Sequence, residues 1–217
     1  MKQGKLRRVL MLRLSLAIVI LQIFSCSFVG EQPENVEEVE KNEVFGTLLN
    51  TSFDLIENDS LDKALGLLDS AKNLDCLKSS LGICYNTIGL CHDKKGDLHE
   101  ALKSYAYASS IFIEIDDSTG LAQTQINAAS CYKIMGIYDR AIMLAIYSEK
   151  YLRRDTNHFK ELAVVYNLIG NIHTENENFS LAMDYHTRSL KIRLNRGGAL
   201  GISSAPSINN LGFCYFK

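Results

Sequence analysis

Gly89-Leu90-Cys91-His92 opens a pattern that this chain repeats, with Gly96 and Ala101 following at fixed distances. The second copy reads Ala129-Ser130-Cys131-Tyr132, followed by Gly136 and Ala141. The third copy reads Gly170-Asn171-Ile172-His173, followed by Ala182, and a last, unfinished copy reads Gly212-Phe213-Cys214-Tyr215. Self-similarity at a period of about 40 residues is typical of a solenoid, in which each unit buries its apolar face against its neighbours.

The spacing within each copy predicts a pair of helices. The small residue that opens each copy allows a second helix to approach closely, and the ring three positions later lies on the same face. Gly96 and Gly136 then suit a tight turn, because the left-handed backbone of such turns favours glycine. Asp97 is expected to cap the second helix, as are Ser60 and Asn178 in other copies. One alanine in each second helix marks a close helix crossing: Ala64, Ala101, Ala141 and Ala182.

This pattern resembles the tetratricopeptide repeat (TPR) family, in the subgroup with extended repeats. The resemblance covers residues 44–217, with about four units and an incomplete last repeat. It implies an all-α fold, a right-handed superhelical solenoid of antiparallel helix pairs. Composition agrees, because two prolines in 217 residues and no tryptophan suit long helices better than a β-sandwich.

The N terminus is predicted to be a signal peptide over residues 1–25. Lysines and arginines precede an apolar run from Leu14 to Phe24, which is the layout of a secretory signal. Ile23-Phe24-Ser25-Cys26 resembles the lipobox of bacterial lipoproteins. That resemblance implies lipidation of Cys26 and a repeat array anchored in the bacterial cell envelope, outside the cytoplasm. An uncleaved membrane anchor and ordinary signal cleavage are the alternatives.

Residues 26–43 are predicted to form an acidic, flexible tether between the anchor and the repeats. Six glutamates fall between Glu31 and Glu43, and so charged a stretch buries too little apolar surface to order itself. The alternative is an extra amphipathic helix that uses Val36 and Val39.

The resemblance also implies a concave groove, lined by the first helix of each unit, that binds a protein or peptide. Asparagines recur on the predicted first helices: Asn86, Asn127, Asn167, Asn209 and Asn210. An amide both donates and accepts hydrogen bonds, so a row of amides suits the backbone of a bound peptide. The alternative is that they are solvated polar positions on the groove wall. We expect no nucleic-acid partner, because the net charge is −2 and no basic stripe is seen.

The positions of the cysteines, histidines and tyrosines indicate packing roles rather than catalytic or metal-binding ones. Cys91, Cys131 and Cys214 share one repeat position and are expected to be small buried side chains. His92 and His173 replace rings and are expected to pack with a satisfied polar edge, whereas three other histidines are expected to be exposed: His99, His158 and His186. Tyr105 and Tyr147 are expected to be core rings. No metal-ligand spacing, phosphate loop or nucleophile motif is seen, so we predict no enzyme, metal or cofactor.

The expected function is therefore a non-catalytic TPR scaffold that binds a protein or peptide and is tethered to the envelope. The pattern stops within the first helix of a unit, before the capping element that closes a solenoid. We therefore expect a truncated version of a longer protein; the alternatives are that the natural protein is itself longer or that a partner supplies the cap. The alternative function is the exported sensor part of a longer signalling protein with a kinase or transcriptional output. The expected structural repeat positions are Gly89, Ala101, Ala129, Gly136, Ala141, Gly170, Ala182 and Gly212.

Overall fold

The computed structural model describes residues 36–74, 77–154, 156–197 and 204–217. The predicted signal peptide, the candidate lipidation site Cys26 and the predicted tether up to residue 35 lie outside the described residues. The chain divides into two compact units, Met1–Glu40 and Lys41–Lys217, and the repeats belong to the second. In the described part of the chain, no helix is both long and apolar enough to cross a membrane.

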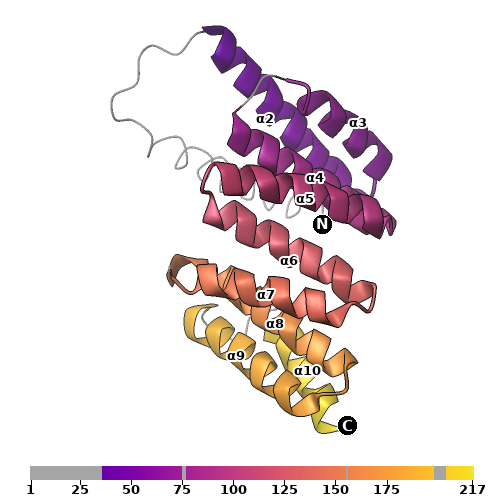
Figure 1. Ribbon diagram of the computed structural model, residues 1–217, viewed down its shortest axis with the longest axis vertical. Helices are drawn as coiled ribbons and strands as arrows, with labels where there is room; N and C mark the ends of the chain where they lie inside the picture. The colour runs from indigo at the N-terminus through magenta and orange to yellow at the C-terminus, as the bar shows by residue number, and fades with distance from the viewer. Residues whose placement is uncertain (1–35, 75–76, 155, 198–203) are drawn as a thin grey trace, which may run out of the picture. The chain divides into compact units, whose positions relative to one another are not determined.

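The described residues form helices without any strand, as Figure 1 shows. The helices are α2 (Val36–Glu57), α3 (Leu61–Ala71), α4 (Lys78–Lys95), α5 (Leu98–Glu114), α6 (Ser118–Ile134), α7 (Tyr138–Leu152), α8 (Phe159–Glu175), α9 (Phe179–Gly197) and α10 (Ala205–Tyr215), with a short 3-10 turn at Thr156–His158. Helix α2 begins inside the segment predicted to be a tether, so residues 36–43 are helical.

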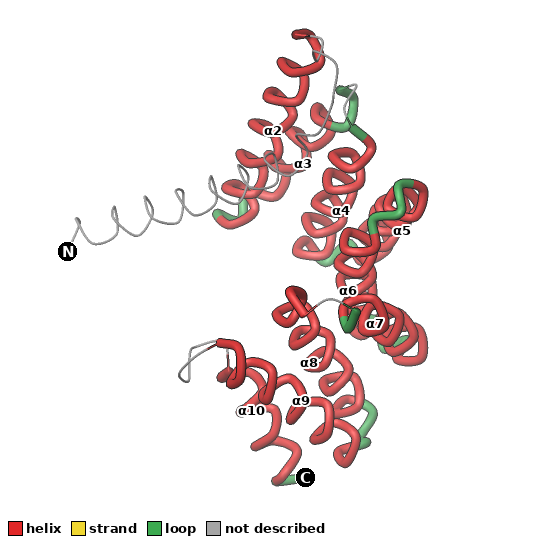
Figure 2. The backbone as a smooth tube through the Cα atoms, turned by 90° about the vertical axis from the view of Figure 1, so that its left-hand side faces the viewer, coloured by secondary structure: helices red, strands yellow, loops and turns green. Residues whose placement is uncertain are grey.

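Each predicted unit is a pair of antiparallel helices. Helix α4 packs against α5, α6 against α7, and α8 against α9, while α10 packs against α9. The first helices of successive units also contact one another, since α4 touches α6 and both α6 and α10 touch α8. Figure 2 shows α5 and α7 together on one side of α4 and α6. The prediction of an all-α, right-handed solenoid of helix pairs is thus confirmed.

The turn between the paired helices of each unit contains one residue in the left-handed conformation. Gly96 has φ +83° and Gly136 has φ +73°, the conformation predicted for them. Asp59 and Glu177 hold the same position in the first and last complete units, with φ +58° and +56°. Because a non-glycine residue adopts this conformation at some cost, glycine is preferred at the turn but the turn forms without it.

The predicted helix caps are only partly correct. Asp97 and Ser60 occupy the N-cap positions of α5 and α3, but neither side chain bonds the helix. Asn178 makes a long contact, with its Oδ1 3.5 Å from the Leu181 amide that donates to it. The best cap is one that the sequence pattern missed: Asp117 Oδ1 accepts from the amides of Thr119 and Gly120 at 3.0 and 2.9 Å.

The paired helices meet through small residues on one helix and rings on the other. A Cβ added at Gly89 would lie 2.4 Å from Cε1 of Tyr105, and one added at Gly170 would lie 2.5 Å from Cε1 of His186. Both rings are therefore seated directly on a glycine. In the unit between them the same positions are Ala129 and the fully buried Ala145. A ring on the second helix thus faces a glycine on the first, whereas the unit without a ring has alanine on both helices.

The prediction that His186 is exposed is wrong. Its side chain is completely buried, because it occupies the ring position that Tyr105 fills in α5. The expectation for Tyr147 is also wrong: this ring is 39% exposed and its hydroxyl pairs with that of Tyr151 at 2.8 Å. Tyr105 is a core ring, as predicted, at 1% exposure.

The cysteines that share one repeat position are buried, as predicted: Cys91, Cys131 and Cys214. Cys91 lies in a cluster with Ala64 and Leu68, and Cys131 lies in one with Ala101 and Tyr105. Each of these two thiols thus faces the second helix of the preceding unit. Burial raises the pKa of the Cys91 thiol to about 11 and that of the Cys131 thiol to about 12, so neither is a ready nucleophile.

Candidate functional site

The asparagines of the first helices bond to one another across neighbouring units. Nδ2 of Asn127 on α6 donates to Oδ1 of Asn86 on α4 at 3.1 Å. Both side chains are partly buried. Because these helices belong to different units, the bond links the units through a polar contact on the first-helix layer.

A second amide cluster joins α8 and α10. Nδ2 of Asn210 donates to Oδ1 of Asn167 at 3.2 Å and to Oδ1 of Asn171 at 2.7 Å. Ser207 lies beside this cluster, fully buried, with its hydroxyl 3.1 Å from that of Ser189. The sequence pattern did not single out Asn171 or Ser207. The signal available for Asn171 was an amide where Leu90 and Ser130 stand in other copies.

Five residues make up what we call the amide face: Asn86, Asn127, Asn167, Asn171 and Asn210. In both clusters the amine of the later asparagine donates to the carbonyl of the earlier one. Among the described residues, the Nδ2 amines of Asn86 and Asn167 and the Oδ1 atoms of Asn127 and Asn210 have no further hydrogen-bond partner. Each pair therefore keeps one donor group and one acceptor group for a ligand.

The amide face is interrupted between α6 and α8. The residue of α8 that corresponds to Asn127 is Leu168, which is only 6% exposed, so no amide pair forms there. Lys133 of α6 and Glu175 of α8 instead form an ion pair at 2.8 Å. Asn209, the fifth asparagine predicted for the groove, is exposed and takes no part in either cluster.

Two histidines lie near the ends of first helices, His92 in α4 and His173 in α8. The Nδ1 atoms of His92 and His173 are buried without a hydrogen-bond partner, contrary to the expected satisfied edge, although Nδ1 of His92 lies 3.8 Å from Oδ2 of Asp97. His173 stacks on the ring of Tyr185 with centroids 5.8 Å apart, and desolvation lowers its pKa. A ring whose charged form is disfavoured in this way acts here as a packing group.

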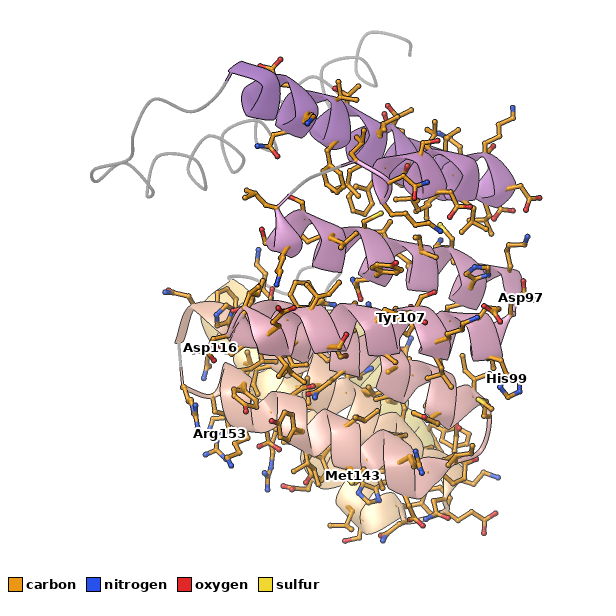
Figure 3. The ribbon with its side chains drawn as sticks, turned by 45° about the horizontal axis from the view of Figure 1, so that its top comes forward. Asp97, His99, Tyr107, Asp116, Met143 and Arg153 are labelled. Carbon is orange, nitrogen blue, oxygen red and sulfur yellow. The ribbon has the colours of Figure 1, made fainter. Side chains whose placement is uncertain are left out.

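The second helices expose a different surface. Tyr107 of α5 and Met143 of α7, both labelled in Figure 3, are 52% and 61% exposed. His99, also labelled in Figure 3, is exposed as predicted.

In the described parts of the chain, no three acidic, histidine or cysteine side chains gather as a metal site would require. The amide face is therefore the recurrent polar feature of the repeats.

The helix pairs and their repeated contacts define the class of fold, which is a TPR-like solenoid. The solved structure of BtubC (BKLC) from P. vanneervenii is similar, with 18% identity, a TM-score of 0.67 and coverage of 86% of this chain and 84% of that one. A putative kinesin light chain with nearly identical TPR-like repeats from Podosopora anserina has 13% identity, a TM-score of 0.64 and coverage of 78% and 84%. A point variant of that protein gives a TM-score of 0.65 at the same identity and coverage.

No family model matches the sequence, and no curated protein matches it. At 13–18% identity the likeness to the solved structures concerns the fold. The residues of the amide face therefore stand on their own geometry.

Proposed function

We propose that this chain is a non-catalytic scaffold that binds a protein or peptide segment along its amide face, tethered to the bacterial cell envelope by its N terminus. The observation that carries the binding proposal is the arrangement of the amide pairs. A peptide group offers one N–H donor and one C=O acceptor. Each pair has the complementary groups left over: an amine on Asn86 or Asn167, and a carbonyl on Asn127 or Asn210.

This arrangement favours recognition of backbone rather than of side chains. The bond between Asn86 and Asn127 holds both amides in one orientation before a ligand arrives. Less side-chain entropy is then lost on binding, and preorganisation of this kind increases affinity. An extended segment has its peptide groups free, since it makes no internal hydrogen bonds. The proposed ligand is therefore an extended peptide segment, held through its main chain.

Replacing Asn86, Asn127 and Asn167 together by alanine is expected to weaken peptide capture by about tenfold or more, because at least one net hydrogen bond of about 1 kcal/mol is lost at each cluster. Peptides selected from a random display library against the parent protein are the probe, with affinity measured by calorimetry. The control is Asn176→Ala, an exposed residue in the turn after α8. Unchanged affinity in the triple variant, with helicity and melting intact, contradicts the proposal.

The same peptides give a second test of backbone recognition. N-methylation of a central peptide group removes its donor, so it is expected to lower affinity more than alanine replacement of the same residue does. The opposite order would mean that side chains are read and that the amide face is not the site. Ligand capture is also the input that an exported sensor would need, so these measurements apply equally to that alternative.

The tether is proposed from the lipobox-like Ile23-Phe24-Ser25-Cys26. Cys26→Ala is expected to release the protein from the membrane fraction, because acylation of that thiol is the proposed anchor. Fractionation of bacteria expressing the parent and the variant, with Cys91→Ala as a control at a buried thiol, provides the measurement. Retention of the Cys26 variant in membranes would favour an uncleaved anchor helix instead.

A further inference from the structure

One residue over the middle of each first helix is exposed, whereas the residues around it are buried or half-buried. This holds for residues 81–90 of α4, 121–130 of α6 and 161–170 of α8, all of which the structure describes. The exposed residue takes the same repeat position each time, six residues before the small residue that opens the copy. The three residues are Ile83, Gln123 and Val164. Any ligand that reaches the amide face therefore also meets this position.

The exposed position is aliphatic in the two helices that offer a free amide amine. Ile83 precedes Asn86 by three residues and is 42% exposed. Val164 precedes Asn167 by three residues and is 45% exposed. Side chains three apart on a helix are neighbours, with Cβ atoms about 5–6 Å apart. In α6 the counterpart of Asn86 is the buried Ile126, and the exposed position holds a glutamine. The aliphatic side chain and the free amine thus occur together.

The folding of these helices does not account for an isoleucine and a valine at this position. Branching at Cβ restricts the side-chain rotamers in a helix, so both residues have a lower helix propensity than leucine, lysine or glutamine. Both helices also have their covering partner in place, α5 against α4 and α9 against α8. Ile83 and Val164 are therefore not the uncovered part of a helix pair.

The surface around these positions is uncharged. None of the residues 79–91, 118–132 and 162–172 is acidic or basic, although Asp, Glu, Lys and Arg make up 22% of the whole chain. The two lysines that adjoin these stretches already have partners, because Lys78 pairs with Glu114 and Lys133 with Glu175. A charged ligand side chain placed here would lose its water without gaining an opposite charge, which is unfavourable.

We propose that the segment bound by the amide face carries an aliphatic side chain beside the peptide group that the amides hold, and that Ile83 and Val164 select it. This inference rests on the proposed function. A residue next to the bonded peptide group lies within reach of an aliphatic side chain one helical turn away. Contact between the two removes apolar surface of both from water. The amides thus hold the main chain, which contributes more of the affinity, and Ile83 and Val164 set the class of side chain beside it.

Peptides selected from a random display library against the parent protein are the probe. They are expected to carry valine, isoleucine or leucine next to the peptide group at which N-methylation lowers affinity most. Ile83→Glu and Val164→Glu are each expected to raise the dissociation constant of these peptides about three- to tenfold, because a carboxylate replaces the apolar contact. The matched control is Ile146→Glu, at an isoleucine 47% exposed on the second helix α7, which should leave the affinity unchanged.

A second selection, against the Ile83→Glu variant, is expected to return lysine or arginine where the first returned an aliphatic residue. Charged residues at that position in peptides selected by the parent, unchanged affinity in both glutamate variants, or a second selection without basic residues would each overturn this inference. The proposed function would still stand if replacing Asn86, Asn127 and Asn167 weakened binding. Normal binding by that triple variant would overturn the proposed function and this inference with it.

Discussion

Gly89→Ala and Tyr105→Ala are each expected to destabilise the chain, and the double variant is expected to be more stable than the sum of the two effects predicts. A Cβ at residue 89 would lie 2.4 Å from the Tyr105 ring. That ring is 1% exposed and has no room to move away. Overpacking of this kind costs about 1–3 kcal/mol. Removing the ring leaves a cavity, at a cost of about 3–5 kcal/mol.

The double variant reproduces a contact that the chain already contains, namely the fully buried Ala129 and Ala145 of the next unit. The clash disappears with the ring, and alanine favours a helix over glycine by up to about 1 kcal/mol. We therefore expect a coupling free energy of about 1–3 kcal/mol, measured by urea unfolding of the parent, both single variants and the double variant. Gly66→Ala is the control, because its Cβ meets no neighbour. Additive single effects would mean that residues 89 and 105 do not share one space.

Acid is expected to destabilise the last complete unit through His186. Burial lowers the pKa of this side chain from 6.5 to about 4, and its Nδ1 has no hydrogen-bond partner in the described structure. Between these two pKa values the unfolded chain therefore binds a proton that the folded chain does not. Stability is complete above about pH 6.5, falls as the pH falls toward 4, and loses about 3 kcal/mol in all, since each unit of pKa difference corresponds to about 1.4 kcal/mol.

His186→Phe is expected to remove most of this acid sensitivity, because phenylalanine keeps the ring over Gly170 without a titrating group. Desolvation also lowers the pKa of His173, so a smaller loss of the same sign remains. The free energy of unfolding measured from pH 7.5 to 4 checks the result. His99→Phe, at an exposed histidine, should keep the slope of the parent. An unchanged slope in the His186 variant would contradict this origin of the acid sensitivity.

Much of the fold was predictable from local pattern. The period, the small residues and the turn glycines all report on contacts that recur in every unit, so several copies carry the same information. Gly96 and Gly136 show this most directly, because glycine is the residue that best tolerates the positive φ of this turn. The side-chain caps were less predictable. Asp97 and Asp117 both precede a helix, yet only the orientation of Asp117 allows its carboxylate to bond the first turn.

The position of His186 illustrates where local pattern fails. Polarity alone predicts exposure, although His186 follows Ala182 at the distance at which Tyr105 follows Ala101. The ring is buried because Gly170, sixteen positions earlier, leaves a space for it. The expectation for Tyr147 is wrong in the opposite direction. Its face of α7 meets no covering helix among the described residues, so the ring predicted to lie in the core is 39% exposed.

Spacing along the chain was enough to define the class of fold, the order of the helices and the residues that repeat in each unit, because these depend on one helix or one turn at a time. The pairing of Asn127 with Asn86 and of Asn210 with Asn167 depended on how the units pack in three dimensions. These residues are about one repeat apart, and a difference of one position in their register determines which amide each one meets. The burial of His186 likewise became visible only once its ring was seen to lie over Gly170. Exposure is a property of what packs against a residue, which no single stretch of sequence contains.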